Sequence, residues 1–92
     1  MDVKRYHIIV TGRVQGVGFR FFVRDAASSL GLSGWVRNLS GGGVEIEAEG
    51  AQSDIDRLIE RLKNGPPLSR VTDVAAQVMV AMGSGEEFVI RR

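Results

Sequence analysis

The 92-residue sequence contains no cysteine and only one histidine. The absence of cysteine excludes disulfide bonds, thiolate catalysis and cysteine-built metal sites. Clusters of carboxylates with histidine are also absent, so we expect no metal site. No apolar run approaches the ~20 residues of a membrane span, and no secretory signal precedes the first alternating segment. We therefore expect a cytoplasmic protein without a membrane partner.

The charges nearly cancel, with 12 Lys and Arg residues, 11 Asp and Glu residues and a formal net charge of +1. This balance gives no general attraction to nucleic acid or to a membrane surface. The local distribution is uneven, because no acidic residue lies between Val3 and Arg24, where Arg13 and Arg20 also stand. A solvated positive face is one interpretation. A site for a small anionic ligand is the other, and the glycines of the same segment favour it.

The hydrophobic pattern predicts a single domain, residues 1–92, with one sheet and two helices around one core. Alternating and β-branched residues indicate strands, whereas apolar residues at i, i+3, i+4 and i+7 indicate helices. The predicted elements are strand 6–10, helix 19–30, strands 33–39 and 44–49, helix 53–63, strand 71–80 and a short edge strand 88–90. This β-α-β-β-α-β order predicts an α+β, ferredoxin-like sandwich with an antiparallel sheet and two helices on one face.

Several conspicuous side chains receive a structural interpretation. Strict alternation along strand 44–49 predicts that Glu45, Glu47 and Glu49 face water. Ser53 is expected to cap the second helix. Trp35 is expected in the core or between a helix and the sheet.

A glycine-punctuated segment, GRVQGVGFR at residues 12–20, connects the first strand to the first helix. Glycines let backbone N–H groups turn inward, and the helix N-terminus adds a partial positive charge. The guanidinium of Arg20 provides a planar fork of donors that suits phosphate oxygens. The segment fits neither the nucleotide P-loop nor the dinucleotide fingerprint, since Phe21 stands where the fingerprint needs its third glycine. It indicates an anion site of another kind, and a tight connection with a solvated Arg20 is the alternative.

The predicted topology places a second polar residue beside this segment. The first helix is a crossover, so strands 6–10 and 33–39 run parallel, with strand 44–49 between them. Their C-terminal ends then lie at the same edge of the sheet, about 10 Å apart. Arg20 and Asn38 can therefore converge on one small ligand, although Asn38 alone would be a strand-end residue that caps the next turn. His7 and Asp25 are expected to be structural, solvated or paired.

Residues 12–20, together with GLSGWVRN at residues 31–38, resemble the motifs of the acylphosphatase family, and the resemblance extends over essentially the whole chain. It implies an enzyme that hydrolyses acyl phosphates to a carboxylate and inorganic phosphate without metal or cofactor. It also implies that Arg20 binds the phosphate and that Asn38 holds the attacking water. The phosphate cradle that it implies consists of the backbone amides of Gln15, Gly16, Val17, Gly18, Phe19 and Arg20.

Two positions depart from the family pattern. Leu39 stands where a hydroxyl residue often follows the asparagine, so support for the loop must come from elsewhere. Gly18 is a third loop glycine at a position where some members carry a larger residue. Neither departure affects Arg20 or Asn38.

A binding module is the rival class, because ferredoxin-like folds also host single-stranded RNA recognition. The corresponding RNA motif lies on the third strand, whereas here the glycine-rich segment is a loop and strand 44–49 is acidic and lacks aromatic residues. We therefore expect no nucleic-acid partner. The resemblance implies a small-molecule acyl phosphate as substrate with inorganic phosphate as product, and we expect the protein to be a monomer. A sensor that binds phosphate or carbamoyl phosphate without turnover is a third possibility, and the presence of both Arg20 and Asn38 argues against it.

Overall fold

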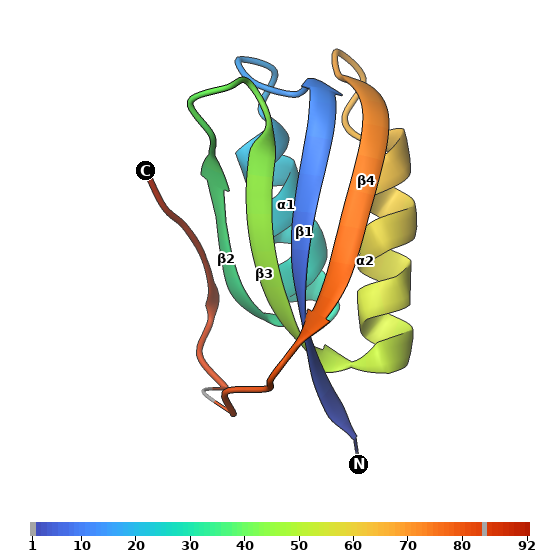
Figure 1. Ribbon diagram of the computed structural model, residues 1–92, viewed down its shortest axis with the longest axis vertical. Coiled ribbons are helices and arrows are strands. Elements are labelled where there is room, and N and C mark those ends of the chain that lie inside the picture. The colour runs from blue at the N-terminus through green and yellow to red at the C-terminus, as the bar shows by residue number, and fades with distance from the viewer. Residues whose placement is uncertain (1, 84) are drawn as a thin grey trace.

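The computed structural model describes residues 2–83 and 85–92, and its element order agrees with the order predicted from the sequence (Figure 1). The elements are β1 (Val3–Arg13), α1 (Phe19–Ser29), β2 (Ser33–Asn38), β3 (Val44–Ala51), α2 (Gln52–Asn64), β4 (Arg70–Met79) and β5 (Phe88–Ile90). No helix of the described residues is long and apolar enough to cross a membrane.

The five strands form one sheet in the order β4-β1-β3-β2-β5. β1 pairs antiparallel with both β3 and β4, and β3 pairs antiparallel with β2. Both helices lie on one face, behind the sheet in Figure 1. The predicted sandwich is therefore confirmed, and β3 separates β1 from β2 as expected. β5 runs parallel to β2, so the sheet is mixed rather than purely antiparallel.

The core lies between the helices and the covered face of the sheet. α1 contributes Phe19, Val23, Ala26 and Ala27, which recur at helical spacing and are all buried. α2 contributes Ile55, Leu58 and Leu62, each fully buried. Phe19 is only 1 % exposed, and it therefore fixes the first turn of α1 against the core. Arg20 follows it directly, so the packing of Phe19 also sets where the arginine leaves the helix.

The glutamates of β3 do not face water, and this prediction is wrong. Glu49 is 3 % exposed and pairs with Arg5 at 3.2 Å. Its carboxylate also accepts hydrogen bonds from the backbone N–H groups of Met82 and Gly83, each at 2.7 Å. Burial raises the pKa of Glu49, but these two N–H donors and the Arg5 guanidinium together outweigh burial and hold the pKa below its ordinary value of 4.5.

The other two glutamates of β3 are also paired. Glu47 meets Arg5 at 2.8 Å, and Glu45 lies between His7, at 2.7 Å, and Arg37. The partners of these glutamates come from β1 and β2, the two strands that flank β3. Alternation along one strand identifies the face of the sheet that a side chain occupies, but it does not identify the charges that neighbouring strands place opposite it.

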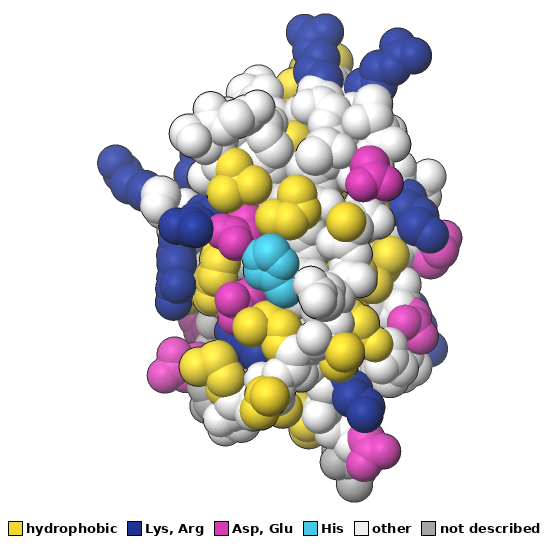
Figure 2. Space-filling view, viewed as in Figure 1, with side chains coloured by type: hydrophobic (Ala, Val, Ile, Leu, Met, Phe, Trp, Pro, Cys, Tyr) yellow, Lys and Arg dark blue, Asp and Glu magenta, His cyan; other side chains and the backbone are white. Residues whose placement is uncertain are grey.

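Two smaller predictions are also wrong. α2 begins at Gln52 with Ala51 as its N-cap residue, and no side chain caps it, so Ser53 lies inside the helix. Trp35 lies on the sheet face that the helices leave open, where the guanidinium carbons of Arg37 and Arg91 lie 5.5 Å and 4.9 Å from its ring centroid. Figure 2 shows this open face, on which hydrophobic, acidic and histidine side chains lie side by side.

Candidate functional site

The glycine-rich loop connects the end of β1 to the start of α1. Gly16 and Gly18 have φ values of 72° and 77°, in the left-handed region that favours glycine. A Cβ at either position would meet no atom within 4 Å, so the backbone conformation rather than crowding accounts for these glycines. Gly18 is the N-cap residue of α1 and supplies no side-chain cap. The loop therefore delivers the chain to an uncapped helix N-terminus.

The N-terminus of α1 leaves backbone donors available. The first helical hydrogen bond runs from the Phe22 N–H to the Gly18 carbonyl at 3.0 Å, so the amides just before Phe22 have no intrahelical partner. The first turn of α1 contains no acidic residue. Free N–H groups and the helix dipole together favour an anion at this position.

A pocket of about 210 Å³ lies at this helix end. It is lined by Val14, Gly16, Gly18, Phe19, Arg20, Phe21 and Asn38. Asn38 is the last residue of β2, whereas Arg20 belongs to the first turn of α1. The structure therefore brings the two predicted side chains to one pocket, as the parallel arrangement of β1 and β2 requires. Among the residues that the structure describes, the lining contains no carboxylate, imidazole or hydroxyl group.

The Gln15 side chain connects the loop to the turn between β2 and β3. Its Nε2 donates to the carbonyl oxygen of Leu39 at 2.7 Å and to that of Gly43 at 2.9 Å. Leu39 directly follows Asn38, so Gln15 links the loop to the segment that carries the asparagine. The sequence suggested only the backbone amide of Gln15 as functional. Its side chain supplies the support that Leu39, which lacks a hydroxyl group, cannot provide.

Arg20 is half-buried, and among the described residues no carboxylate lies within 4.0 Å of its guanidinium. Its Nη1 donates to the carbonyl oxygen of Arg91, just after β5, at 3.4 Å. A carbonyl oxygen orients the guanidinium without neutralising it, so the charge remains available to a ligand.

The other two arginines of this region do not line the pocket. Arg24 pairs with its neighbour Asp25 at 3.2 Å, and its guanidinium carbon lies 5.2 Å from the ring centroid of Phe21. Arg13 is exposed at the end of β1, opposite Arg70 of β4. Of the three arginines around the loop, only Arg20 contributes its charge to the pocket.

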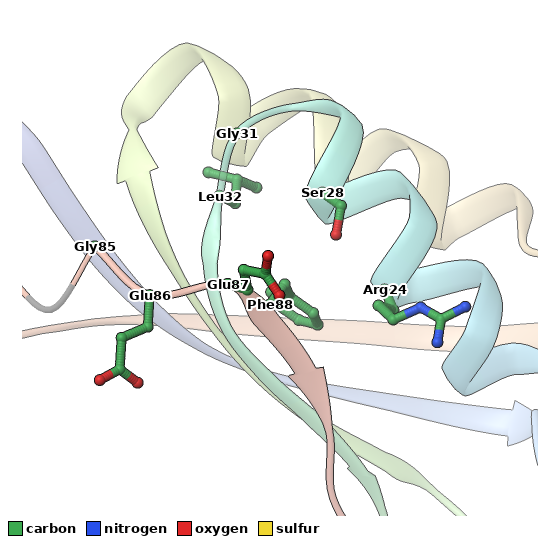
Figure 3. Close-up of a pocket in the computed structure, with 8 residues that line it drawn as sticks. All are labelled: Arg24, Ser28, Gly31, Leu32, Gly85, Glu86, Glu87 and Phe88. Carbon is green, nitrogen blue, oxygen red and sulfur yellow. The ribbon is translucent and has the colours of Figure 1, made fainter.

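A second groove, of about 460 Å³, lies between α1 and the segment that precedes β5 (Figure 3). It includes Glu86 and Glu87, and the Arg24 side chain in Figure 3 extends away from Glu86. Two carboxylates repel a phosphate group, so this groove suits an anion poorly. None of the predicted site residues lines it.

The fold and the pocket define a ferredoxin-like protein with an arginine and an uncapped helix N-terminus at one edge of its sheet. The family model for acylphosphatase matches residues 6–90. An acylphosphatase from Methylococcus capsulatus is 47% identical over 90 residues, which cover 98% of each chain.

Solved structures agree with this match. The crystal structure of acylphosphatase from Bacillus subtilis superimposes with a TM-score of 0.93 at 44% identity, covering 97% of this chain and 99% of that one. An acylphosphatase from Coxiella burnetii also gives 0.93, at 41% identity, with 98% and 94% coverage. The chain belongs to the acylphosphatase family, and it is an enzyme that hydrolyses acyl phosphates.

Proposed function

We propose that the 210 Å³ pocket binds the phosphoryl group of the acyl phosphate and that Asn38 orients the attacking water. In this proposal the backbone amides from Gln15 to Arg20 and the Arg20 guanidinium surround the phosphoryl oxygens. The observation that carries it is the presence of Arg20 and Asn38, from two different elements, in the lining of one pocket. The unpaired charge of Arg20 and the uncapped N-terminus of α1 support it.

The chemistry needs no general base from the protein. Water attacks phosphorus, the bond between phosphorus and the bridging oxygen breaks, and its electron pair leaves with the carboxylate. A carboxylate is a good leaving group, so protonation of the departing oxygen is not required. Catalysis then depends on positioning and on stabilising charge at the phosphoryl oxygens. Because the lining contains no basic carboxylate or imidazole, a phosphate oxygen of the substrate accepts the proton of the water.

The Asn38 amide suits the role of orienting a water. It offers both a hydrogen-bond acceptor and a donor and carries no charge that would repel a dianion. Its position at the end of β2 is fixed by antiparallel pairing with Val44 of β3. The side chain of Gln15 connects the following turn to the loop through two hydrogen bonds, which supports a water site and a phosphate site at a fixed separation.

Hydrolysis of benzoyl phosphate, measured with and without a chelator, tests the proposed function. We expect turnover that the chelator does not change. Arg20→Ala should remove nearly all activity while the fold survives, because it deletes the fixed charge in the pocket. Arg13→Ala is the matched control, because Arg13 is exposed and lies outside the lining. Equal activity in Arg20→Ala and Arg13→Ala would contradict the assignment.

Phosphate binding tests the cradle independently of turnover. Inorganic phosphate should inhibit competitively and raise the Tm of the wild type, since a ligand of the native state stabilises it. The rise in Tm should disappear in Arg20→Ala. A wild type that binds phosphate tightly but never hydrolyses benzoyl phosphate would instead be the phosphate sensor.

We further infer that residues 1–92 act as one domain, since one hydrophobic core joins both helices to the sheet, and that this domain acts as a monomer. Sedimentation at the assay concentration tests the monomer. The cytoplasmic compartment remains a prediction from the sequence, and cell fractionation tests it.

A further inference from the structure

The pocket lining offers only one surface to a group that projects from the bound phosphate. Gly16 and Gly18 have no side chains, and Val14 and Phe19 are each only 1 % exposed. Arg20 and Asn38 are assigned to the phosphate and the water. Phe21 remains, and it is 56 % exposed, so it is the one lining side chain with a large accessible apolar area.

The position of Phe21 is well defined for an exposed aromatic residue. It belongs to the first turn of α1, next to Arg20 and two residues after the fully buried Phe19. The Arg24 guanidinium lies 5.2 Å from its ring centroid, and Arg24 is itself held by Asp25. A cation over one face of the ring restricts the ring orientation and leaves the other face available.

In-line displacement separates the water from the acyl group. The attacking and leaving oxygens lie on opposite sides of phosphorus. If Asn38, at the end of β2, holds the water, the acyl group leaves the pocket away from Asn38. The accessible apolar surface of the lining on α1 is the ring of Phe21.

We propose that Phe21 is the contact surface for the acyl group and that it gives the enzyme a preference for planar or apolar acyl groups over acetyl. This inference rests on the proposed function of the pocket. A benzoyl ring stacks on the free face of Phe21, whereas an acetyl group covers little of it. An aromatic pair of this kind contributes about 0.5–1.5 kcal/mol, equivalent to roughly a two- to tenfold preference.

The test compares kcat/KM for benzoyl phosphate with kcat/KM for acetyl phosphate in the wild type and in three variants. Phe21→Ala should lower the benzoyl-to-acetyl ratio by about two- to tenfold, because kcat/KM for benzoyl phosphate falls further than kcat/KM for acetyl phosphate. Phe21→Leu keeps apolar area without the ring and should give an intermediate ratio. Leu68→Ala is the matched control, because Leu68 is 76 % exposed and lies outside the pocket lining.

Two outcomes overturn the inference. An unchanged ratio in Phe21→Ala would show that the acyl group does not contact the ring. An equal loss with both substrates would assign Phe21 to the support of α1 rather than to the acyl group. Circular dichroism and the Tm of each variant establish that it is folded before the ratio is compared.

A binding experiment separates this inference from the proposed function. Benzoylphosphonate and acetylphosphonate carry a carbon–phosphorus bond in place of the bridging oxygen and are not substrates for the displacement. Calorimetry should show tighter binding of benzoylphosphonate to the wild type and loss of that preference in Phe21→Ala. If Phe21→Ala loses the preference for benzoylphosphonate but the wild type hydrolyses no acyl phosphate, the contact with Phe21 is supported and the hydrolysis is refuted. If the wild type hydrolyses acyl phosphates but Phe21→Ala keeps the preference for benzoylphosphonate, only the contact with Phe21 is refuted.

Discussion

Replacing Gln15 by Ala removes the two hydrogen bonds that connect the loop to the β2–β3 turn. Neither carbonyl loses its last donor, because Leu39 O also accepts from the Gly42 N–H at 3.1 Å and Gly43 O from the Leu39 N–H at 2.8 Å. The full penalty of a buried unpaired acceptor therefore does not apply. At about 1 kcal/mol for each bond, the loss is about 2 kcal/mol.

This free energy has two measurable consequences. If the bonds stabilise the whole fold, the Tm of a domain of this size should fall by roughly 10 °C. If they hold the loop closed while the rest of the fold stays intact, kcat/KM should fall by up to about 30-fold, since 1.36 kcal/mol corresponds to a factor of ten. Thermal unfolding measures the change in Tm, and benzoyl phosphate hydrolysis measures the change in kcat/KM. Saturating phosphate should restore part of a lowered Tm.

Two further variants sharpen the comparison. Gln15→Met keeps the length of the side chain but has no N–H donor. If the hydrogen bonds matter, its Tm or kcat/KM should therefore fall as far as that of Gln15→Ala. Gln77→Ala is the control, because Gln77 is exposed on β4. A Gln15→Ala protein with wild-type Tm and wild-type kcat/KM would refute the role of Gln15 as a connection between the two segments.

Three further predictions concern other residues. Asn38→Ala should lower turnover by about 10²-fold while phosphate affinity stays within a few-fold, because in the proposed function the amide acts on the water rather than on the phosphate. Kinetics and calorimetry on the same variant check this, and a proportional loss of turnover and affinity would place Asn38 in the cradle. Arg20→Lys should restore little of the activity lost in Arg20→Ala, since an ammonium cannot reproduce the planar fork; near-normal kcat/KM would exclude a two-pronged contact. Glu49→Gln should lower the free energy of unfolding by about 2 kcal/mol at neutral pH. Because its folded pKa is lowered, Glu49 stabilises the fold above pH 4.5 and loses this effect as the pH falls through the folded pKa. When the pH is lowered from neutral to acidic, the free energy of unfolding should therefore fall less in the variant than in the wild type. Equal decreases in the two proteins would contradict the pairing of Glu49.

Much of the fold could be predicted because the apolar residues of this chain follow regular periods. Phe19, Val23 and Ala27 recur at helical spacing, and all three are buried on one side of α1. The meeting of Arg20 and Asn38 could also be predicted, since a crossover helix makes β1 and β2 parallel and places their C-terminal ends at one edge.

The contacts that the sequence did not predict all join distant segments through side chains. Arg5 and Glu49 lie 44 positions apart, and nothing within either strand indicates the other as its partner. The Gln15 connection likewise depends on the path of the β2–β3 turn.

Trp35 is a different case, because Val36 beside it is fully buried and alternation along β2 then places Trp35 on the open face. The size and aromaticity of Trp35 favour a core position, but the alternation along β2 determines its face.

The distribution of acidic groups explains why only one of the grooves beside α1 suits a dianion. On the open face the carboxylates of β3 are each paired with an arginine from β1 or β2. Glu86 and Glu87 line the neighbouring groove. The pocket at the N-terminus of α1 has no acidic lining residue and keeps the charge of Arg20 unneutralised among the described residues. A net charge of +1 therefore conceals an uneven local field, which favours an anion at the loop over the acidic groove beside it.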